Sequence, residues 1–295
     1  YSNLERTVDQ IDATLGDGSI LLDYSGGTGI LTDRLLTRWG DRDRKVLIVD
    51  SSAKFLRLAV EKFADDPRVA FRRIHYLKDE RRLQTLQECV DAPMLQRGVD
   101  AIASTNAIHL YYNLEDTLRS WFGAIRPDGH VFIQSGNIDN PRCAEDEWII
   151  DNTVHAIHER AVEMVRGGAF PAYRSAIDEL TRMSQYDRLR SKYFLPVRPL
   201  DHYLGALRRS GFGTLEHDVG RIEASVDEWF EFLSAYHAGV LGWVGGTEKI
   251  DGVAPSEQAV EDRLALMRQA LMEVFEGAEQ FACCWSYILA RREGD

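Results

Sequence analysis

The stretch Ile20–Leu31, ILLDYSGGTGIL, decides the fold. An apolar run ends on an acid, three glycines fall within four residues, and an apolar run resumes. This pattern predicts a buried strand over 19–24, a loop of bare backbone, and a helix over 30–39. Glycine lets the main chain approach a ligand closely, and the start of a helix offers unpaired N–H groups. The stretch therefore predicts a ligand-binding loop at the carboxyl edge of a parallel sheet.

Strands and helices alternate through the first half of the chain. Further apolar runs predict strands over 45–50, 69–74, 99–105 and 130–136. Helical periodicity follows several of them, and Ser51 or Ser52 is placed to cap the helix after the second strand. Strands joined in this way form βαβ units with a parallel sheet that is covered on both faces. The expected fold class is α/β.

The second half of the chain changes character. Residues 139–200 show mainly helical patterns, and later segments predict two more strands, one of them closing the chain over 281–292. We divide the chain into a core, 1–138, a helical insertion, 139–200, and a segment that completes the core with the last strand pair, 201–295. The insertion is longer than a crossover between strands requires.

Two common nucleotide-binding motifs do not fit the glycine loop. The dinucleotide pattern G-x-G-x-x-G needs glycine or alanine at position 32, where this chain has Thr32. A phosphate-binding P-loop needs Gly-Lys-Ser/Thr, which the loop lacks. These two classes of nucleotide site are therefore disfavoured.

The loop instead resembles the first motif of class I S-adenosylmethionine-dependent methyltransferases, an acid followed by x-G-x-G-x-G. Asp23, Gly27 and Gly29 match this motif, and Ser25 replaces its first glycine. The segments VDAIASTNAIHLYYNLED and AIRPDGHVFI resemble later parts of the same fold, so the resemblance covers about residues 5–137. It implies a Rossmann-like seven-stranded sheet in the order 3-2-1-4-5-7-6, with a helical cap insertion over the methyl-acceptor site.

The resemblance also implies how S-adenosylmethionine is bound. Asp50, at the end of the second strand, is expected to accept hydrogen bonds from the ribose hydroxyls; the alternative is that it caps the next helix. Family members often have an acid after the third strand that binds adenine, and this chain has IHYLKD there. The expected cofactor-binding residues are Asp23, Tyr24, Ser25, Gly26, Gly27, Gly29, Asp50, Ser51, His75, Tyr76 and Asn106.

A general base is less clearly indicated. His109 follows the fourth strand, where an imidazole could take a proton from the acceptor during methylation. In the family this histidine is often structural, so both roles stay open. Asn106 lines the methionine end of the cofactor or forms a turn.

Several aromatic and histidine residues are candidates for the acceptor site. They are Tyr111, His155, Tyr173, His237 and Trp243. His155, His158 and Glu159 have a spacing that can hold a metal on one helix face, but an amphipathic helix explains them better and no metal is expected. The glycine-rich loop around Trp243 could be a lid, a homodimer contact or ordinary packing.

Composition limits the partners. Lys and Arg number 35 against 47 Asp and Glu, which gives a formal net charge of −12. This charge disfavours nucleic acid as the acceptor. No run is apolar enough to span a bilayer, no signal peptide is evident, and the four cysteines are expected to be reduced thiols in a cytoplasmic protein.

The expected activity is methyl transfer from S-adenosylmethionine to oxygen, nitrogen or carbon of a small, secondary-metabolite-like acceptor in a capped pocket. One alternative is a methyltransferase that acts on protein or RNA. The other is a non-catalytic methyltransferase fold that serves as a ligand sensor or partner subunit.

Overall fold

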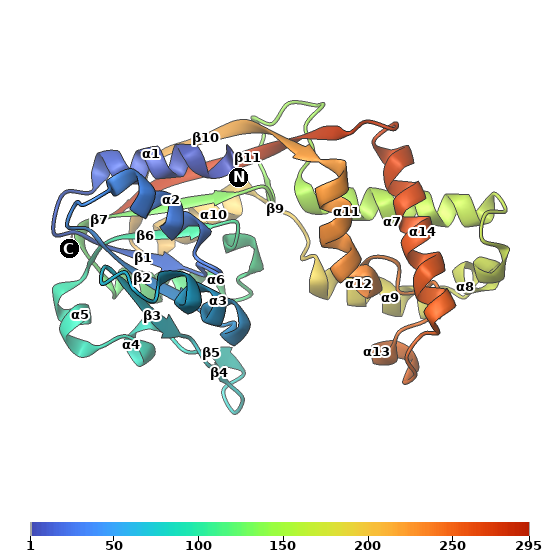
Figure 1. The fold of residues 1–295 in the computed structure, drawn as a ribbon, viewed down its shortest axis with the longest axis horizontal. Helices are drawn as coiled ribbons and strands as arrows, with labels where there is room; N and C mark the ends of the chain where they lie inside the picture. The colour runs from blue at the N-terminus through green and yellow to red at the C-terminus, as the bar shows by residue number, and fades with distance from the viewer. Residues whose placement is uncertain (1, 295) are drawn as a thin grey trace. The chain divides into compact units, whose positions relative to one another are not determined.

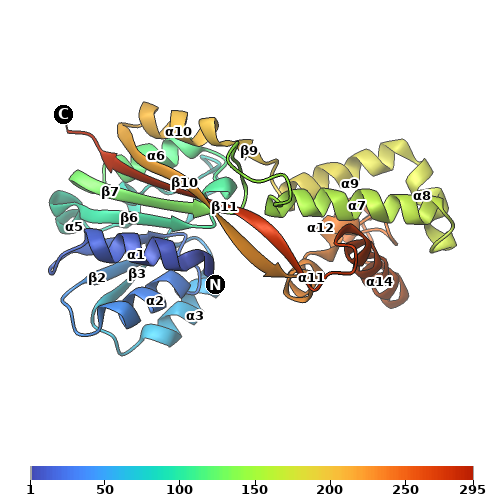
Figure 2. The same ribbon diagram turned by 90° about the horizontal axis from the view of Figure 1, so that it is seen from above.

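The computed structural model describes residues 2–294, which form two units (Figures 1 and 2). The core unit comprises Tyr1–Arg142, Arg198–Gly220 and Trp285–Asp295, and the helical unit comprises Cys143–Val197 and Arg221–Cys284. The stretch Arg221–Cys284 thus belongs to the helical unit, although the sequence analysis placed it in the segment that completes the core. The reason is that its apolar side chains, such as Leu233 and Leu266, pack with those of the inserted helices.

The core unit is built on one seven-stranded sheet. Its strands are, in spatial order, β3 (Val69–Arg73), β2 (Lys45–Asp50), β1 (Ile20–Tyr24), β6 (Val99–Thr105), β7 (Ile125–Ser135), β11 (Gln280–Arg292) and β10 (Phe212–Ser225). The first five pair in parallel, and β11 is antiparallel to β7. This is the predicted order 3-2-1-4-5-7-6, so the predicted fold class is confirmed.

Helices cover both faces of this sheet, as Figure 2 shows. One face packs on α1 (Glu5–Thr14), α2 (Ile30–Trp39) and α3 (Ala53–Phe63), and its core includes Leu21 and Phe132. The other face packs on α4 (Leu86–Cys89), α6 (Leu114–Phe122) and α10 (Leu200–Arg209), and its core includes Leu22 and Ile133. The continuous apolar strands of the sequence are explained by this burial on both faces.

The remaining elements of the core unit are short. They are η1 (Ser2–Leu4), α5 (Ala92–Arg97), η2 (Ile108–Leu110) and the strand pairs β4 (Tyr76–Leu77) with β5 (Arg82–Leu83) and β8 (Ile138–Asp139) with β9 (Arg198–Pro199). The strand predicted over 130–136 begins earlier in the structure, because residues 126–129 lie inside β7. There Val99 pairs with Ile125 and Ala101 with His130, so the intervening residues bulge out of the ladder.

The helical unit has its own apolar core. Its helices are α7 (Ile150–Arg166), η3 (Pro171–Tyr173), α8 (Arg174–Asp178), α9 (Leu180–Tyr193), α11 (Val226–Ala235), α12 (His237–Leu241), α13 (Glu248–Asp251) and α14 (Glu257–Val274). Val154, Ile157, Leu266 and Met267 are fully buried between α7 and α14. The glycine-rich loop predicted around Trp243 lies between the short helices α12 and α13.

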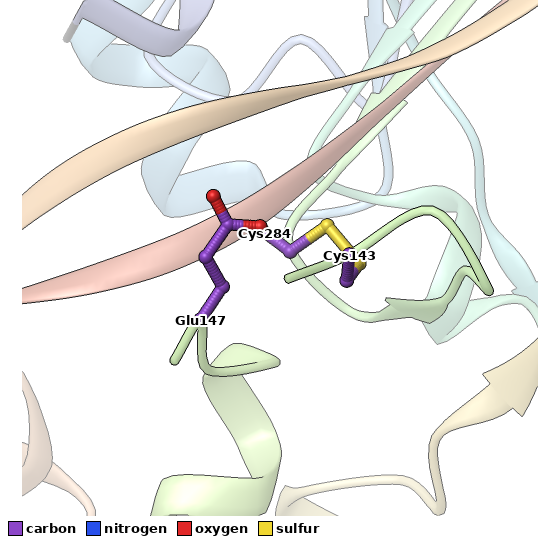
Figure 3. Close-up of side chains that lie close together, drawn as sticks. All are labelled: Cys143, Glu147 and Cys284. Carbon is purple, nitrogen blue, oxygen red and sulfur yellow. A yellow bond between two sulfur atoms is a disulfide. The ribbon is translucent and has the colours of Figure 1, made fainter. Parts of the chain in front are cut away.

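The expectation of four reduced cysteines is wrong for two of them. Cys143 and Cys284 form a disulfide within the helical unit, with their Cα atoms 5.5 Å apart, while Cys89 and Cys283 are free thiols (Figure 3). The two cysteines are 141 residues apart, so no local spacing announced the pair. Disulfides are rare in reducing compartments, which removes the cysteine argument for a cytoplasmic location. Among the described residues, no helix combines the length and apolarity that crossing a membrane requires.

Candidate functional site: the glycine loop and the adjoining cavity

The glycine loop connects β1 to α2 and is held against β2. The backbone N–H groups of Ser25 and Gly26 donate to the carbonyl of Val49 at 2.7 and 3.3 Å. Ser25 adopts a left-handed backbone with φ +58°, which favours glycine, and its hydroxyl accepts a hydrogen bond from Tyr111 at 3.0 Å. The serine that replaces the motif's first glycine is therefore accommodated by a side-chain contact.

The three loop glycines serve different purposes. A Cβ at Gly26 would lie 2.7 Å from the carboxyl carbon of Asp23, and one at Gly29 would overlap the ring of Phe63. A Cβ at Gly27, by contrast, would meet no atom within 4 Å, although the φ of +58° strains any side chain there. Gly26 and Gly29 are thus required by the protein's own packing, whereas Gly27 presents bare backbone to open space, as a cofactor-binding loop should.

Asp23 lies beneath this loop and is completely buried. The Thr32 hydroxyl donates to its Oδ2 at 2.8 Å, while its Oδ1 has no hydrogen-bond partner. Burial raises the pKa of Asp23 from 3.8 to about 7; the bond from Thr32 opposes this rise, and the charge of Asp50 adds to it. A buried carboxyl oxygen without a partner is a place where a cationic ligand group would be favoured.

Asp50 ends β2 and contacts the loop directly. Its Oδ2 accepts a hydrogen bond from the Gly27 N–H at 2.9 Å, and its Oδ1 accepts one from the Ser52 N–H at 2.7 Å. The cap of α3 is Ser52, whose hydroxyl accepts from the Phe55 N–H. Asp50 is therefore not the N-cap of that helix, and its carboxylate remains at the strand end where the ribose is expected.

A cavity of about 800 Å³ opens beside the loop in the core unit. Five predicted cofactor residues line it: Tyr24, Ser25, Asp50, Ser51 and Tyr76. Tyr111, a predicted acceptor-site residue, also lines the cavity. The Tyr111 hydroxyl donates a hydrogen bond to the Ser25 hydroxyl and lies 2.9 Å from the Ser104 hydroxyl. Because its hydroxyl already has two partners, Tyr111 supports the loop.

The far wall of this cavity was missed by the sequence analysis. It is formed by the β4–β5 hairpin, the start of α4 and one face of α6, including Gln84, Thr85, Thr117 and Ser120. Thr85 and Glu88 form a capping box, and the Thr-x-x-Glu pattern could have identified the start of α4. His75 is exposed, and its backbone pairs with Gln84, so Tyr76 is the better placed of the two candidates for the adenine.

His109 is buried and both of its ring nitrogens have partners. Nδ1 lies 3.0 Å from the Ser135 hydroxyl, and Nε2 lies 3.1 Å from the side-chain nitrogen of Asn137. Because an amide nitrogen can only donate, Nε2 is the acceptor and Nδ1 carries the proton. Burial, with a contribution from Arg198, lowers the pKa of His109 to about 4. This geometry favours the structural role over the general base.

Asn106 adopts a left-handed backbone directly after β6, with φ +49°. Its N–H donates to the carbonyl of Gln134 at 2.7 Å, and its side-chain oxygen lies 3.5 Å from the Ser135 hydroxyl. A turn is thus observed at Asn106, and its contact with the methionine end of the cofactor stays a prediction.

The other acceptor candidates all belong to the helical unit. Trp243 is buried, with only 2% of its surface exposed, and Tyr173 donates to Asp262 at 2.7 Å. Nδ1 of His237 lies 2.9 Å from Arg263, a fully buried guanidinium that also donates to backbone carbonyls. His155 is exposed on α7. Trp243 and His237 therefore support the packing around α14, and their role toward an acceptor stays a prediction.

Among the described residues, one group of side chains could hold a metal ion, and it does not include His155 and His158 of α7. Cys143, Glu147 and Cys284 place their ligand atoms within 4.8 Å of one another (Figure 3). The two sulfurs are bonded to each other, so they are not available as thiolate ligands in this state.

Comparison with known proteins shows which family the sequence of the core unit resembles. Residues 22–131 match a family described as a methyltransferase domain. This match and the strand order of the sheet support the predicted class I methyltransferase fold, with S-adenosylmethionine as its cofactor. The bare backbone at Gly27, the free oxygen of Asp23 and the carboxylate of Asp50 fit a cofactor with an amino-acid end and a ribose.

Particular relatives are distant. A stretch of 130 residues is 26% identical to part of the hybrid PKS-NRPS synthetase apdA of Emericella nidulans, covering 44% of this chain but only 3% of that protein. A candidate methyltransferase from Bacillus halodurans aligns over 100% of both chains with a TM-score of 0.55 and 13% identity. The [4+2]-cyclase SpnF aligns over 98% of this chain and 81% of its own, with a TM-score of 0.50 and 16% identity. At these identities the solved structures establish the fold alone.

Proposed function

We propose that this protein transfers a methyl group from S-adenosylmethionine to a small organic acceptor. The observation that carries this proposal is the cavity of about 800 Å³ that adjoins the glycine loop and includes Asp50 among its lining residues. When bound, the cofactor supplies an electrophilic methyl group on a sulfonium. Methyl transfer of this kind depends chiefly on aligning the acceptor atom with the methyl group and sulfur, so positioning is the protein's main contribution.

The residues of the core unit would divide this task. Asp50 accepts the ribose hydroxyls, Gly27 lets the amino-acid end approach the main chain, and Tyr76 covers the base. The aromatic cluster of Tyr24, Tyr111 and Trp121, with ring centroids 5.1–6.1 Å apart, stiffens the wall behind the loop. We assign no general base in the core unit. The predicted candidate, His109, has a hydrogen-bond partner at each ring nitrogen.

Two observations support a small acceptor. The formal net charge of −12 would repel a nucleic acid. The chain is also similar over 130 residues to part of a hybrid PKS-NRPS synthetase. The charge and this similarity both support a small, secondary-metabolite-like acceptor. The capped acceptor pocket, the cytoplasmic location and the homodimer remain predictions.

The test separates cofactor binding from methyl transfer. Calorimetry should show that the protein binds S-adenosylmethionine, and that Asp50→Ala weakens this binding while the exposed control Asp65→Ala does not. Release of S-adenosylhomocysteine is then measured with a panel of small phenols, amines and carboxylic acids, and with RNA and protein. Turnover confined to the macromolecules, or tight binding without turnover on any acceptor, would contradict the proposed function.

A further inference from the structure

The disulfide of the helical unit has a carboxylate beside it that the disulfide itself does not explain. Only 8% of the Glu147 side chain is exposed, and its carboxylate lies within 4.8 Å of the sulfurs of Cys143 and Cys284. In Figure 3 the Glu147 side chain extends toward the two sulfurs. A disulfide carries no charge and donates no hydrogen bond, so it does not compensate a carboxylate that is taken out of water. A cation at this place would.

The cation that the protein itself supplies is shared with other acids. Nη1 of Arg221 lies 3.9 Å from Oε1 of Glu147. The same nitrogen donates a hydrogen bond to Asp146 at 2.7 Å, and Nε of Arg221 donates to Glu223 at 2.9 Å. One guanidinium thus faces three carboxylates, and Glu147 keeps the capacity to bind a second cation.

Backbone hydrogen bonds hold this group of side chains together independently of the disulfide. The Glu147 N–H donates to the carbonyl of Ala144 at 3.1 Å, and the Ala144 N–H donates to the Glu147 carboxylate at 3.0 Å. The next residue, Trp148, donates its N–H to Ala282 at 2.8 Å and accepts from the Cys284 N–H at 2.9 Å. Because none of these bonds involves sulfur, both sulfurs stay beside the carboxylate when the disulfide is opened.

Two thiolates and a carboxylate form a donor set that suits zinc. Zn²⁺ binds cysteine sulfur at about 2.3 Å and carboxylate oxygen at about 2.0–2.2 Å, so the ligand atoms of one tetrahedral ion lie about 3–4 Å apart. The separations in the helical unit, all within 4.8 Å, are close to this geometry. Thiolate ligands favour zinc over magnesium and calcium. Three protein ligands leave the fourth position of the ion to water.

The neighbouring thiol does not compete for this role. Cys283 is fully buried and belongs to the apolar core of the helical unit. Successive side chains of a strand point to opposite faces, so Cys283 is directed away from the side of β11 on which Cys284 lies. Cys143, by contrast, is partly exposed, which gives a small reductant access to the disulfide.

We propose that Cys143, Cys284 and Glu147 form a redox-controlled zinc site, of which the disulfide is the oxidised, metal-free state. A dithiol reductant opens the site by thiol–disulfide exchange: its two thiols become a disulfide, and Cys143 and Cys284 become thiols. Zn²⁺ then binds both sulfurs as thiolates together with Glu147, and two protons are released to solvent. Oxidation by another disulfide reverses these steps and releases the ion. The site lies in the helical unit and does not depend on the proposed function.

The experiment titrates Co²⁺, a spectroscopic substitute for zinc, into the full chain in both redox states. Wild type is reduced with dithiothreitol, which is then removed by anaerobic gel filtration. Reduced wild type should bind one Co²⁺ per chain with thiolate-to-metal absorption, and Zn²⁺ should displace it. Oxidised wild type should show no such absorption. Zn²⁺ should also raise the melting temperature of the reduced protein and leave that of the oxidised protein unchanged.

Variants test the ligand set. Glu147→Gln retains the disulfide and, once reduced, should bind Co²⁺ about 10-fold or more weakly than wild type. Glu145→Gln, on an exposed residue of the same turn, is the matched control. Cys89→Ser removes the free thiol of the core unit and should leave Co²⁺ binding unchanged.

Three results would overturn the inference. Absence of thiolate-to-metal absorption in reduced wild type rules out the site, and this result does not depend on the folding of any variant. Equal affinity of Glu147→Gln and Glu145→Gln for Co²⁺ removes Glu147 from the ligand set. The same absorption in oxidised wild type shows that the disulfide does not control metal binding.

Discussion

Asp23→Asn should make the core unit more stable, by an amount that depends on pH. The carboxyl group is completely buried, and burial raises its pKa from 3.8 to about 7. In the unfolded chain the carboxyl ionises near pH 3.8, whereas in the folded protein it stays protonated up to about pH 7. The unfolded state therefore binds fewer protons between these two values, so the free energy of unfolding falls as pH rises and is constant above pH 7.

The size of this effect follows from the same values. Each pKa unit corresponds to about 1.4 kcal/mol, so the full loss between pH 3.8 and 7 is about 4 kcal/mol. Asparagine has the shape of the protonated acid and does not ionise. The stability of Asp23→Asn relative to wild type should therefore increase by about 2–3 kcal/mol between pH 5 and pH 7.

Urea unfolding followed by tryptophan fluorescence measures this difference, since Trp39 and Trp121 are buried in the core unit. The curves are recorded for wild type and Asp23→Asn from pH 5 to pH 8, with the exposed Asp9→Asn as control. A stability difference that stays constant over this range would refute the argument, because it would show that Asp23 does not carry a proton in the folded protein near neutral pH.

Four further outcomes are expected. Asp50→Ala should weaken S-adenosylmethionine binding by about 1–3 kcal/mol in calorimetry, because a charged acceptor is lost; unchanged affinity would contradict the ribose assignment. Gly27→Val should abolish binding, because its side chain would fill open space beside the loop, and wild-type affinity in a folded variant would show that the cofactor does not pass there. Cys143→Ser should lower the free energy of unfolding by about 2–5 kcal/mol, and loss of the same amount after reduction of wild type would confirm the cause. His109→Gln should leave the pH dependence of methyl transfer between about pH 6 and 8 unchanged, since the pKa of His109 is about 4; a lost inflection would restore His109 as the base.

The positions of the strands could be predicted because a strand is indicated by adjacent residues in the sequence. Buried parallel strands appear as short apolar runs, and the run that ends on Asp50 coincides with β2 (Lys45–Asp50). Two of the loop glycines, Gly27 and Gly29, have positive φ, a local conformation that favours glycine. These features depend on a few adjacent residues, which a single sequence displays directly.

The features that were missed depend on residues that are distant in the chain. Cys143 and Cys284 are brought together only by the fold. Glu147 lies beside them only because Trp148 is hydrogen-bonded to Ala282 and Cys284 of β11. His109 carries no sequence signal that separates a base from a structural histidine, because the difference lies in its bonds to Ser135 and Asn137.

The central claim is that the glycine loop and the adjoining cavity bind S-adenosylmethionine. A crystal structure of the protein with S-adenosylhomocysteine tests it most directly. We expect the ribose hydroxyls within hydrogen-bonding distance of Asp50, the base beside Tyr76 and the amino-acid end over Gly27. A nucleoside bound elsewhere, with this crevice accessible in the crystal and empty, would contradict the account.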